Sequence, residues 1–128
     1  PAVFVLRLVP GMRADIIPLL APHYRALVLE SFGVGGLPGG EHGEMFAALR
    51  RWCESGRLAV FTTQVPHEGC DLAVYEVGRA VGELPGVLEA RDMTPEAVAV
   101  KLMWALGQTE DRKKAARLFE TPIEYDIM

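Results

Sequence analysis

Four short apolar runs, each followed by a segment with helical periodicity, constrain the fold of this chain more than any other feature. The runs cover Val3–Val9, Ala26–Glu30, Leu58–Thr62 and Gly86–Ala90. Each has the length and composition that are typical of a strand in a sheet covered on both faces. Repeated strand–helix alternation requires right-handed crossovers between parallel strands. The sequence therefore predicts a small three-layer α/β domain, with a four-stranded, mostly parallel sheet flanked by helices in a flavodoxin-like arrangement.

The segments between and after these runs predict five helices. We expect them over Asp15–Ala21, Glu41–Glu54, Leu72–Val81, a segment starting at Thr94, and Glu110–Phe119. The second helix gathers its apolar side chains on one face, as a helix packed on a sheet does: Met45, Phe46, Leu49, Trp52 and Cys53. Asp15 is placed to cap the first helix, and Gly56 is placed to end the second.

Residues 92–104 contain the most definite helix start in the chain. Thr94 can accept a hydrogen bond from a free backbone N–H of the first turn. Pro95 then stands at the first helical position, where its missing N–H loses no hydrogen bond. Asp92 and Glu96 place negative charge at the positive end of the helix dipole.

This helix is apolar almost all the way round, with Lys101 as its only charge after the first turn. Such a helix is buried on more than one side. We expect one face to pack on the sheet and another to meet a protein surface, either a preceding domain or a second copy of the chain. A Trp104 wholly buried within this domain would contradict that expectation.

Composition limits the classes of protein. A chain of 128 residues, half of them hydrophobic, is enough for one domain with a real core. The net charge of −4 argues weakly against a nucleic acid or an anionic membrane as partner. No apolar run reaches the roughly 18 residues of a spanning helix. Two cysteines favour free thiols in a reducing compartment. We interpret the abrupt start at Pro1 as a cut fragment or a domain boundary.

The candidate binding residues follow the predicted strands, at the carboxyl edge where parallel sheets bind ligands. One loop, residues 31–40, contains five glycines, among them Gly33, Gly35 and Gly36. It fits neither the dinucleotide fingerprint nor the P-loop, which needs a lysine and a hydroxyl. We therefore favour a loop shaped for close backbone approach to a neighbour or a small ligand.

The other candidate groups follow the third strand. Thr62, Thr63 and Gln64 could bind a small polar ligand, or could equally bond to nearby backbone. The metal-binding residue types that follow match no zinc spacing, and we interpret them as solvated: His67, Glu68, Cys70 and Asp71. The residues assemble no nucleophile with a base. By itself the sequence indicates a small-ligand or partner-binding domain, not a complete enzyme.

Several motifs together resemble the C-terminal domain of cytoplasmic (type I) L-asparaginases. They occur in the family's order between residue 3 and about residue 120: Arg7–Met12, Leu29–Pro38, Thr63–Gln64, Tyr75–Arg79, Asp92–Glu96 and Lys101–Leu102. The resemblance implies a parent enzyme that hydrolyses L-asparagine to L-aspartate and ammonia by threonine chemistry, without metal or cofactor. It implies that the catalytic residues lie in an N-terminal domain, so that this domain alone is inactive.

The resemblance also implies a cytoplasmic location and a homo-oligomer, a dimer or tetramer, in which this domain helps to close an active site. Thr63, Gln64 and Tyr75 match the family pattern as ligand or interface contacts. Glu30 stands where one allosteric asparagine site has an arginine, Gly36 where several members have asparagine, and Val65 replaces a cysteine. A carboxylate cannot bind a ligand carboxylate as a guanidinium does, because the two groups carry like charge. These departures therefore argue against that form of allostery.

Two alternatives stay open. The related subunit of a tRNA-dependent amidotransferase has a similar helix at Lys101–Gly107, although the segment Phe32–Pro38 favours an asparaginase. The chain could also be a free-standing regulatory domain that binds a small ligand and has no catalytic partner.

Overall fold

The computed structural model describes residues 3–9, 11–31, 43–63, 79–90 and 93–121, and its centre is a parallel sheet. The four strands are β1 (Val3–Arg7), β2 (Ala26–Ser31), β3 (Leu58–Thr63) and β4 (Val87–Glu89). They lie side by side in chain order, and all three pairings are parallel. The predicted four-stranded sheet is thus confirmed. The first strand is shorter than expected and ends at Arg7 instead of Val9.

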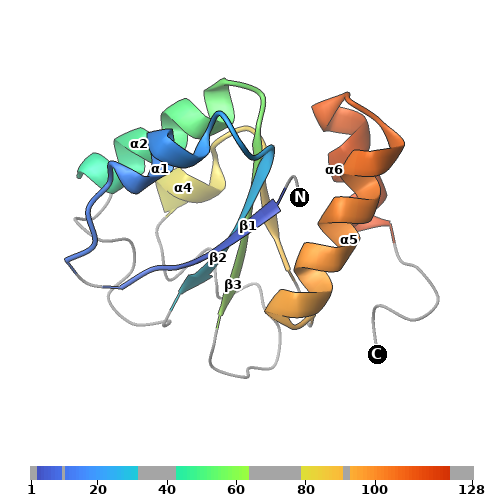
Figure 1. Ribbon diagram of the computed structural model, residues 1–128, viewed down its shortest axis with the longest axis horizontal. Coiled ribbons are helices and arrows are strands. Elements are labelled where there is room, and N and C mark those ends of the chain that lie inside the picture. The colour runs from blue at the N-terminus through green and yellow to red at the C-terminus, as the bar shows by residue number, and fades with distance from the viewer. Residues whose placement is uncertain (1–2, 10, 32–42, 64–78, 91–92, 122–128) are drawn as a thin grey trace.

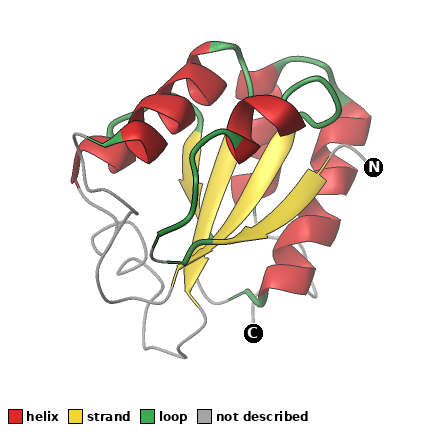
Figure 2. Cartoon of the chain, turned by 60° about the vertical axis from the view of Figure 1, so that its left-hand side comes forward, coloured by secondary structure: helices red, strands yellow, loops and turns green. Residues whose placement is uncertain are grey.

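Helices cover both faces of this sheet (Figures 1 and 2). One layer holds α1 (Ile16–Leu20), α2 (Glu44–Glu54) and α4 (Arg79–Gly82); the other holds α5 (Pro95–Gln108) and α6 (Arg112–Glu120). Each crossover moves one strand further in the same direction, so right-handed connections put the first layer on a single face. The three predicted layers are confirmed. Their strand order is sequential, whereas flavodoxin inserts its first strand between the second and third.

Side chains of the central strands alternate between two cores. From β2, Leu27 and Leu29 face α1 and α2, whereas Ala26 and Val28 face α5 and α6. All four are fully buried. The predicted apolar face of α2 joins the first core, including Cys53 and Trp52. Both faces of the sheet are therefore closed, which explains why these strands read as continuous apolar runs.

The helix ends confirm some of the predicted caps and correct others. The Thr94 hydroxyl accepts from the N–H of Ala97 at 3.1 Å, as predicted. Asp15 does stand at the start of α1 but makes no capping hydrogen bond, because its backbone is already helical (φ −67°, ψ −13°) whereas an N-cap residue is normally extended. That predicted cap is wrong. The start of α6 has a cap that the sequence reading missed, since Asp111 accepts from the Lys113 N–H at 2.8 Å.

The predicted helix boundaries are otherwise close. The second helix begins at Glu44, three residues later than expected, because extended Gly43 is its N-cap. It ends as predicted, before Gly56, whose φ of +92° favours glycine. The first part of the helix expected over Leu72–Val81 lies outside the described residues, and α4 covers its end.

Three arginines cap helix carboxyl ends at the amino edge, the edge at which the strands begin. Arg57 donates to the Ala21 carbonyl after α1 at 2.8 Å, and Arg25 donates to the Leu106 carbonyl of α5 at 2.9 Å. Arg112 donates to the Cys53 carbonyl near the end of α2. The last carbonyls of a helix have no partner within the helix. These guanidinium groups therefore satisfy acceptors and tie both helical layers to the sheet.

Candidate functional site

A row of polar side chains crosses the carboxyl edge of the sheet on the face covered by α5. Arg7 is the register partner of Glu30, and Glu30 is the register partner of Thr62. Alternation along the strands puts all three on one face, because Val28 and Val60, two residues earlier, belong to the core under α5 and α6. The strands thus bring together three residues that lie far apart in the sequence.

Arg7 and Glu30 of this row form an ion pair. The Arg7 guanidinium Nε lies 3.4 Å from a carboxylate oxygen of Glu30. The Arg7 side chain is 60% exposed, but that of Glu30 is only 12% exposed. Thr62 is 1% exposed. Of these three side chains, only that of Arg7 is largely accessible, whereas those of Glu30 and Thr62 are nearly buried.

The start of α5 lies at the same edge. The N–H of Ala90, just after β4, bonds to the Phe61 carbonyl of β3 at 3.1 Å, and the N–H of Met93 bonds back to Ala90 at 3.3 Å. The capped first turn at Thr94 follows directly. The predicted helix cap thus lies beside the strand ends.

The other candidate residues from the sequence reading fall only partly within the described residues. Thr63 is the last residue of β3 and pairs in register with Ser31. Several lie outside the described residues: Gly33, Gly35, Gly36, Gln64, Tyr75 and Asp92. The segment with His67, Glu68, Cys70 and Asp71 also lies outside them. Among the residues that the structure describes, no group of three or more His, Cys, Asp or Glu side chains could hold a metal ion.

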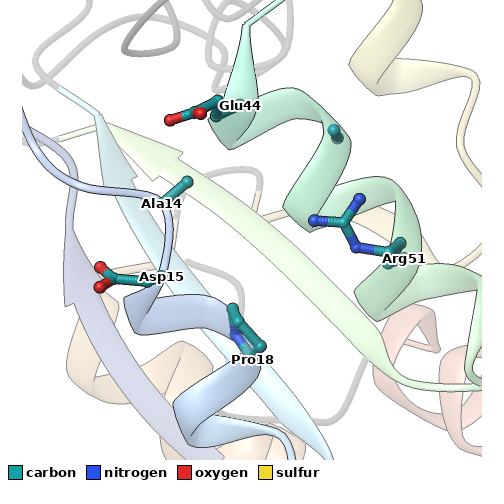
Figure 3. A pocket seen from close by; sticks show the side chains of 6 residues that line it. Ala14, Asp15, Pro18, Glu44 and Arg51 are labelled. Carbon is teal, nitrogen blue, oxygen red and sulfur yellow. The ribbon is translucent and has the colours of Figure 1, made fainter.

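A groove between α1 and α2, which the sequence reading missed, lies on the opposite face of the sheet (Figure 3). Its volume is about 440 Å³, and it is lined by Ala14, Asp15, Pro18, Glu44, Ala47 and Arg51. Its small side chains are Ala14, just before α1, and Ala47 of α2. The charged groups stand on its exposed rim, so it is an open surface feature.

The described residues contain one cysteine, and its thiol is unsuited to nucleophilic chemistry. Burial raises the pKa of Cys53 to about 11, and Arg112 nearby offsets only part of that effect. A reactive thiol needs a lowered pKa and access to solvent. Cys53 is therefore a core residue, as the sequence reading preferred.

The outward side of α5 is apolar and exposed. Val100 is 66% exposed, and Met103 and Trp104 are each 41% exposed. The outcome that would have contradicted the expected second interface, a wholly buried Trp104, is not observed. Lys101 is 5% exposed, and its ammonium donates to the Thr121 carbonyl after α6 at 2.8 Å. No helix among the described residues has the length and apolar character to cross a membrane.

Comparison with known proteins gives a consistent family. A sequence model of the glutaminase/asparaginase C-terminal domain matches residues 2–119. The chain is 38% identical over 127 residues to an L-asparaginase of Thermococcus kodakarensis, covering 99% of this chain and 38% of that protein. It is 36% identical over 127 residues to a glutamyl-tRNA(Gln) amidotransferase subunit of Metallosphaera sedula, covering 97% of this chain and 28% of that protein.

Solved structures agree with the sequence relatives. The thermostable L-asparaginase from T. kodakarensis superposes with a TM-score of 0.83 at 37% identity, over 100% of this chain and 38% of that one. L-asparaginase I from Vibrio cholerae gives 0.82 at 26% identity, over 99% and 38%. The chain spans well under half the length of the relatives it matches. The chain belongs to the glutaminase/asparaginase C-terminal domain family.

Proposed function

We propose that this chain is the C-terminal domain of an L-asparaginase that hydrolyses L-asparagine to L-aspartate and ammonia. The observation that carries the proposal is the match to the T. kodakarensis L-asparaginase, at 38% identity along 99% of the chain. The parent enzyme has two domains. A catalytic N-terminal domain supplies the nucleophile, and the isolated C-terminal domain is inactive.

In this proposal the carboxyl edge of the sheet faces the active site. Loops at that edge would exclude water and position the substrate: the glycines Gly33, Gly35 and Gly36, and Thr63, Gln64 and Tyr75. The rigid sheet supports this role, because Glu30 and Thr62 at the base of the loops are nearly buried. The parent enzyme would act as a dimer or tetramer in the cytoplasm.

We further propose that Glu30 does not take part in asparagine-dependent allostery. Its carboxylate is already paired with Arg7 and is nearly buried. A ligand carboxylate at this point would meet a like charge, which disfavours binding. Addition of asparagine should therefore give hyperbolic, not sigmoidal, kinetics in the parent enzyme.

The second candidate function is that of the amidotransferase subunit, and the observation that favours it is the 36% identity to the M. sedula protein. A third candidate, a free-standing domain that binds a small ligand, would need no catalytic partner. The asparaginase interpretation is preferred because the T. kodakarensis relative and the superposed structures named above are L-asparaginases.

The deciding experiment measures ammonia release from L-asparagine and L-glutamine by two proteins. One is the 128-residue chain, and the other is the same chain joined to the catalytic N-terminal domain that the proposal requires. We expect activity only in the joined protein, and faster with asparagine. Activity of the shorter chain alone would refute the proposal. Co-purification with a tRNA-binding protein would favour the amidotransferase instead.

A further inference from the structure

The two helices of the second layer are secured to the domain to very different extents (Figure 1). Helix α6 packs chiefly on α5, and the buried residues among its nine are Ala115 and Phe119. Helix α5 has six buried residues and also contacts β1 and β2. Because α6 buries little apolar surface and lies on one neighbour, its attachment depends strongly on the polar contacts at its two ends.

Lys101 of α5 holds the carboxyl end of α6. Its ammonium donates to the carbonyl of Thr121, the C-cap of α6, at 2.8 Å and lies 5.6 Å from the centroid of the Phe119 ring. Lys101 is 5% exposed while α6 is docked. A buried ammonium needs such partners because it has lost its water, and it regains water when the partners move away. The contact is therefore strong when closed and reversible.

Arg112, the first residue of α6, holds the amino end of the helix. Its guanidinium donates to the Cys53 carbonyl near the end of α2, in the other helical layer. On the way its side chain passes over Gly86, since a Cβ there would stand 3.2 Å from Arg112 Nη1. Single cationic side chains thus anchor α6 at both ends, one to α5 and one to α2.

The connection between α5 and α6 contains a hinge. Arg25 donates to the carbonyls of Leu106 and Thr109, at 2.9 and 3.2 Å, and so fixes the chain as far as Thr109. Exposed Glu110 follows, and extended Asp111 then caps α6. An exposed hydrogen bond of 3.1 Å crosses this point, from the Asp111 N–H to the Thr109 hydroxyl. Rotation at Glu110 can therefore move α6 with its cap while α5 stays in place.

We propose that α6 is a strap that opens as a unit about Glu110 while α5 and the sheet stay folded, and that Lys101 and Arg112 keep it closed. Opening takes Ala115 and Phe119 out of the core that they share with α5, and so bares that side of α5. Segments with few buried apolar contacts open at a lower cost in free energy than the whole domain. The strap goes beyond the proposed function, because it involves neither substrate nor catalysis.

The first test is amide hydrogen exchange of the 128-residue chain and of its variant Lys101→Met, which keeps the length of the side chain but not the ammonium. The amides of residues 115–121 should exchange roughly tenfold faster in the variant, because a hydrogen bond from a charged donor is lost. Those of β2 and β3 should keep their rates. The matched control, Lys113→Met, removes an exposed lysine from α6 and should change exchange by about twofold at most.

The second test uses the lysines of the unmodified chain as reporters. The sequence has three: Lys101, Lys113 and Lys114. An N-hydroxysuccinimide ester should modify exposed Lys113 and Lys114 quickly, and buried Lys101 only when α6 opens. Arg112→Met loosens the far end of the strap and should speed the labelling of Lys101 roughly tenfold. The control Arg117→Met, on the exposed side of α6, should not.

Four results would overturn the proposal. Lys101→Met could leave the exchange of α6 unchanged, speed only its last turn, or speed the strands as much as α6, which would mean that α6 opens only with the whole domain. Labelling of Lys101 could also be indifferent to Arg112→Met. Neither test needs enzymatic activity, so failure of the asparaginase assay leaves both interpretable, and a strap that does not open leaves the proposed hydrolysis untouched.

Discussion

The two edges of the sheet are built by different means. At the amino edge, Arg25, Arg57 and Arg112 each donate to a backbone carbonyl at or just after a helix end. At the carboxyl edge, Arg7 makes a long contact with the Glu30 carboxylate and is mostly exposed. Arginine side chains thus bind backbone carbonyls at the amino edge, whereas the arginine at the carboxyl edge lies mostly in solvent.

This difference separates stability from function. Removal of such a half-buried guanidinium takes a hydrogen bond from a helix-end carbonyl, which costs free energy of folding. The Cys53 carbonyl loses least, because it also accepts from the Gly56 N–H at 3.1 Å. An ion pair whose guanidinium lies mostly in solvent, as in Arg7, is weak, and that guanidinium can contact a ligand or another surface instead. The amino edge therefore holds the layers together, and the carboxyl edge remains available to the active site in the proposed function.

Replacement of Arg57 should have the largest effect. Arg57 donates to the carbonyls of Ala21 and Tyr24 and lies 5.4 Å from the centroid of the Trp52 ring. Arg57→Met keeps most of the side-chain volume but leaves both carbonyls without this donor. We expect a loss of about 3 kcal/mol in the free energy of unfolding, measured by urea titration. A loss below about 1 kcal/mol would show that the arginine–carbonyl hydrogen bonds of the amino edge contribute little to the stability of the fold.

Gly86, between α4 and β4, tests the same edge by crowding. Its φ is +85°, and a Cβ would stand 2.7 Å from the Arg57 carbonyl oxygen. Gly86→Ala should therefore lose about 2–3 kcal/mol, from strain and from displacement of that backbone. The matched control is Gly56→Ala, where φ is similar at +92° but nothing lies within 4 Å. It should lose only about 1 kcal/mol. If both variants lost the same stability, the positive φ alone would explain the loss, and crowding against the Arg57 carbonyl would contribute nothing.

Much of this organisation could be predicted from the sequence, because it depends on local patterns. The buried strands, the apolar face of α2 and the Thr94 cap follow from periodicity and from neighbouring residues. The failure at Asp15 is also local in origin, since the backbone of Asp15 is helical and does not adopt the extended conformation of a capping residue. A residue type favourable for capping therefore predicts where a cap can form, but the backbone conformation at that residue decides whether it does.

The long-range polar contacts could not be predicted. Arg25 lies 81 residues from Leu106, and Arg112 lies 59 residues from Cys53. No periodicity links such residues, because their contact depends on how the crossovers place the helices over the sheet. The Arg7–Glu30 pair joins adjacent strands whose register the sequence leaves undefined. The resemblance to asparaginases drew attention to Glu30 as a candidate position, and the structure shows that Glu30 pairs with Arg7.

Alkaline pH offers a smaller perturbation at the amino edge, through Cys53. The pKa of its thiol is about 11 in the folded chain, above the ordinary value of 9.0, because burial disfavours the thiolate. Below about pH 9 the thiol is protonated in both the folded and the unfolded chain, so the folded state keeps its full stability. As the pH rises from about 9 to 11, only the unfolded thiol ionises, and the folded state loses stability. The loss amounts to about 2 kcal/mol. In urea titrations between about pH 8 and 11, the free energy of unfolding of the unmodified chain should fall by about 2 kcal/mol more than that of the Cys53→Ala variant. If the unfolding free energies of the two proteins changed with pH in the same way, the raised pKa of the buried Cys53 thiol would be contradicted.

The smallest effect should follow replacement of Arg7 at the carboxyl edge. Arg7→Met removes an ion pair whose guanidinium is 60% exposed, so water and salt already screen most of its attraction to Glu30. We expect a loss of about 0.5 kcal/mol or less, which disappears in about 1 M NaCl. The comparison with Arg57→Met is decisive because both changes replace arginine by the same apolar side chain. If the two variants lost equal stability, the edges would not differ as the contacts indicate. If Arg7→Met instead left stability intact but altered asparagine hydrolysis in the longer protein, the carboxyl edge would be tied directly to function.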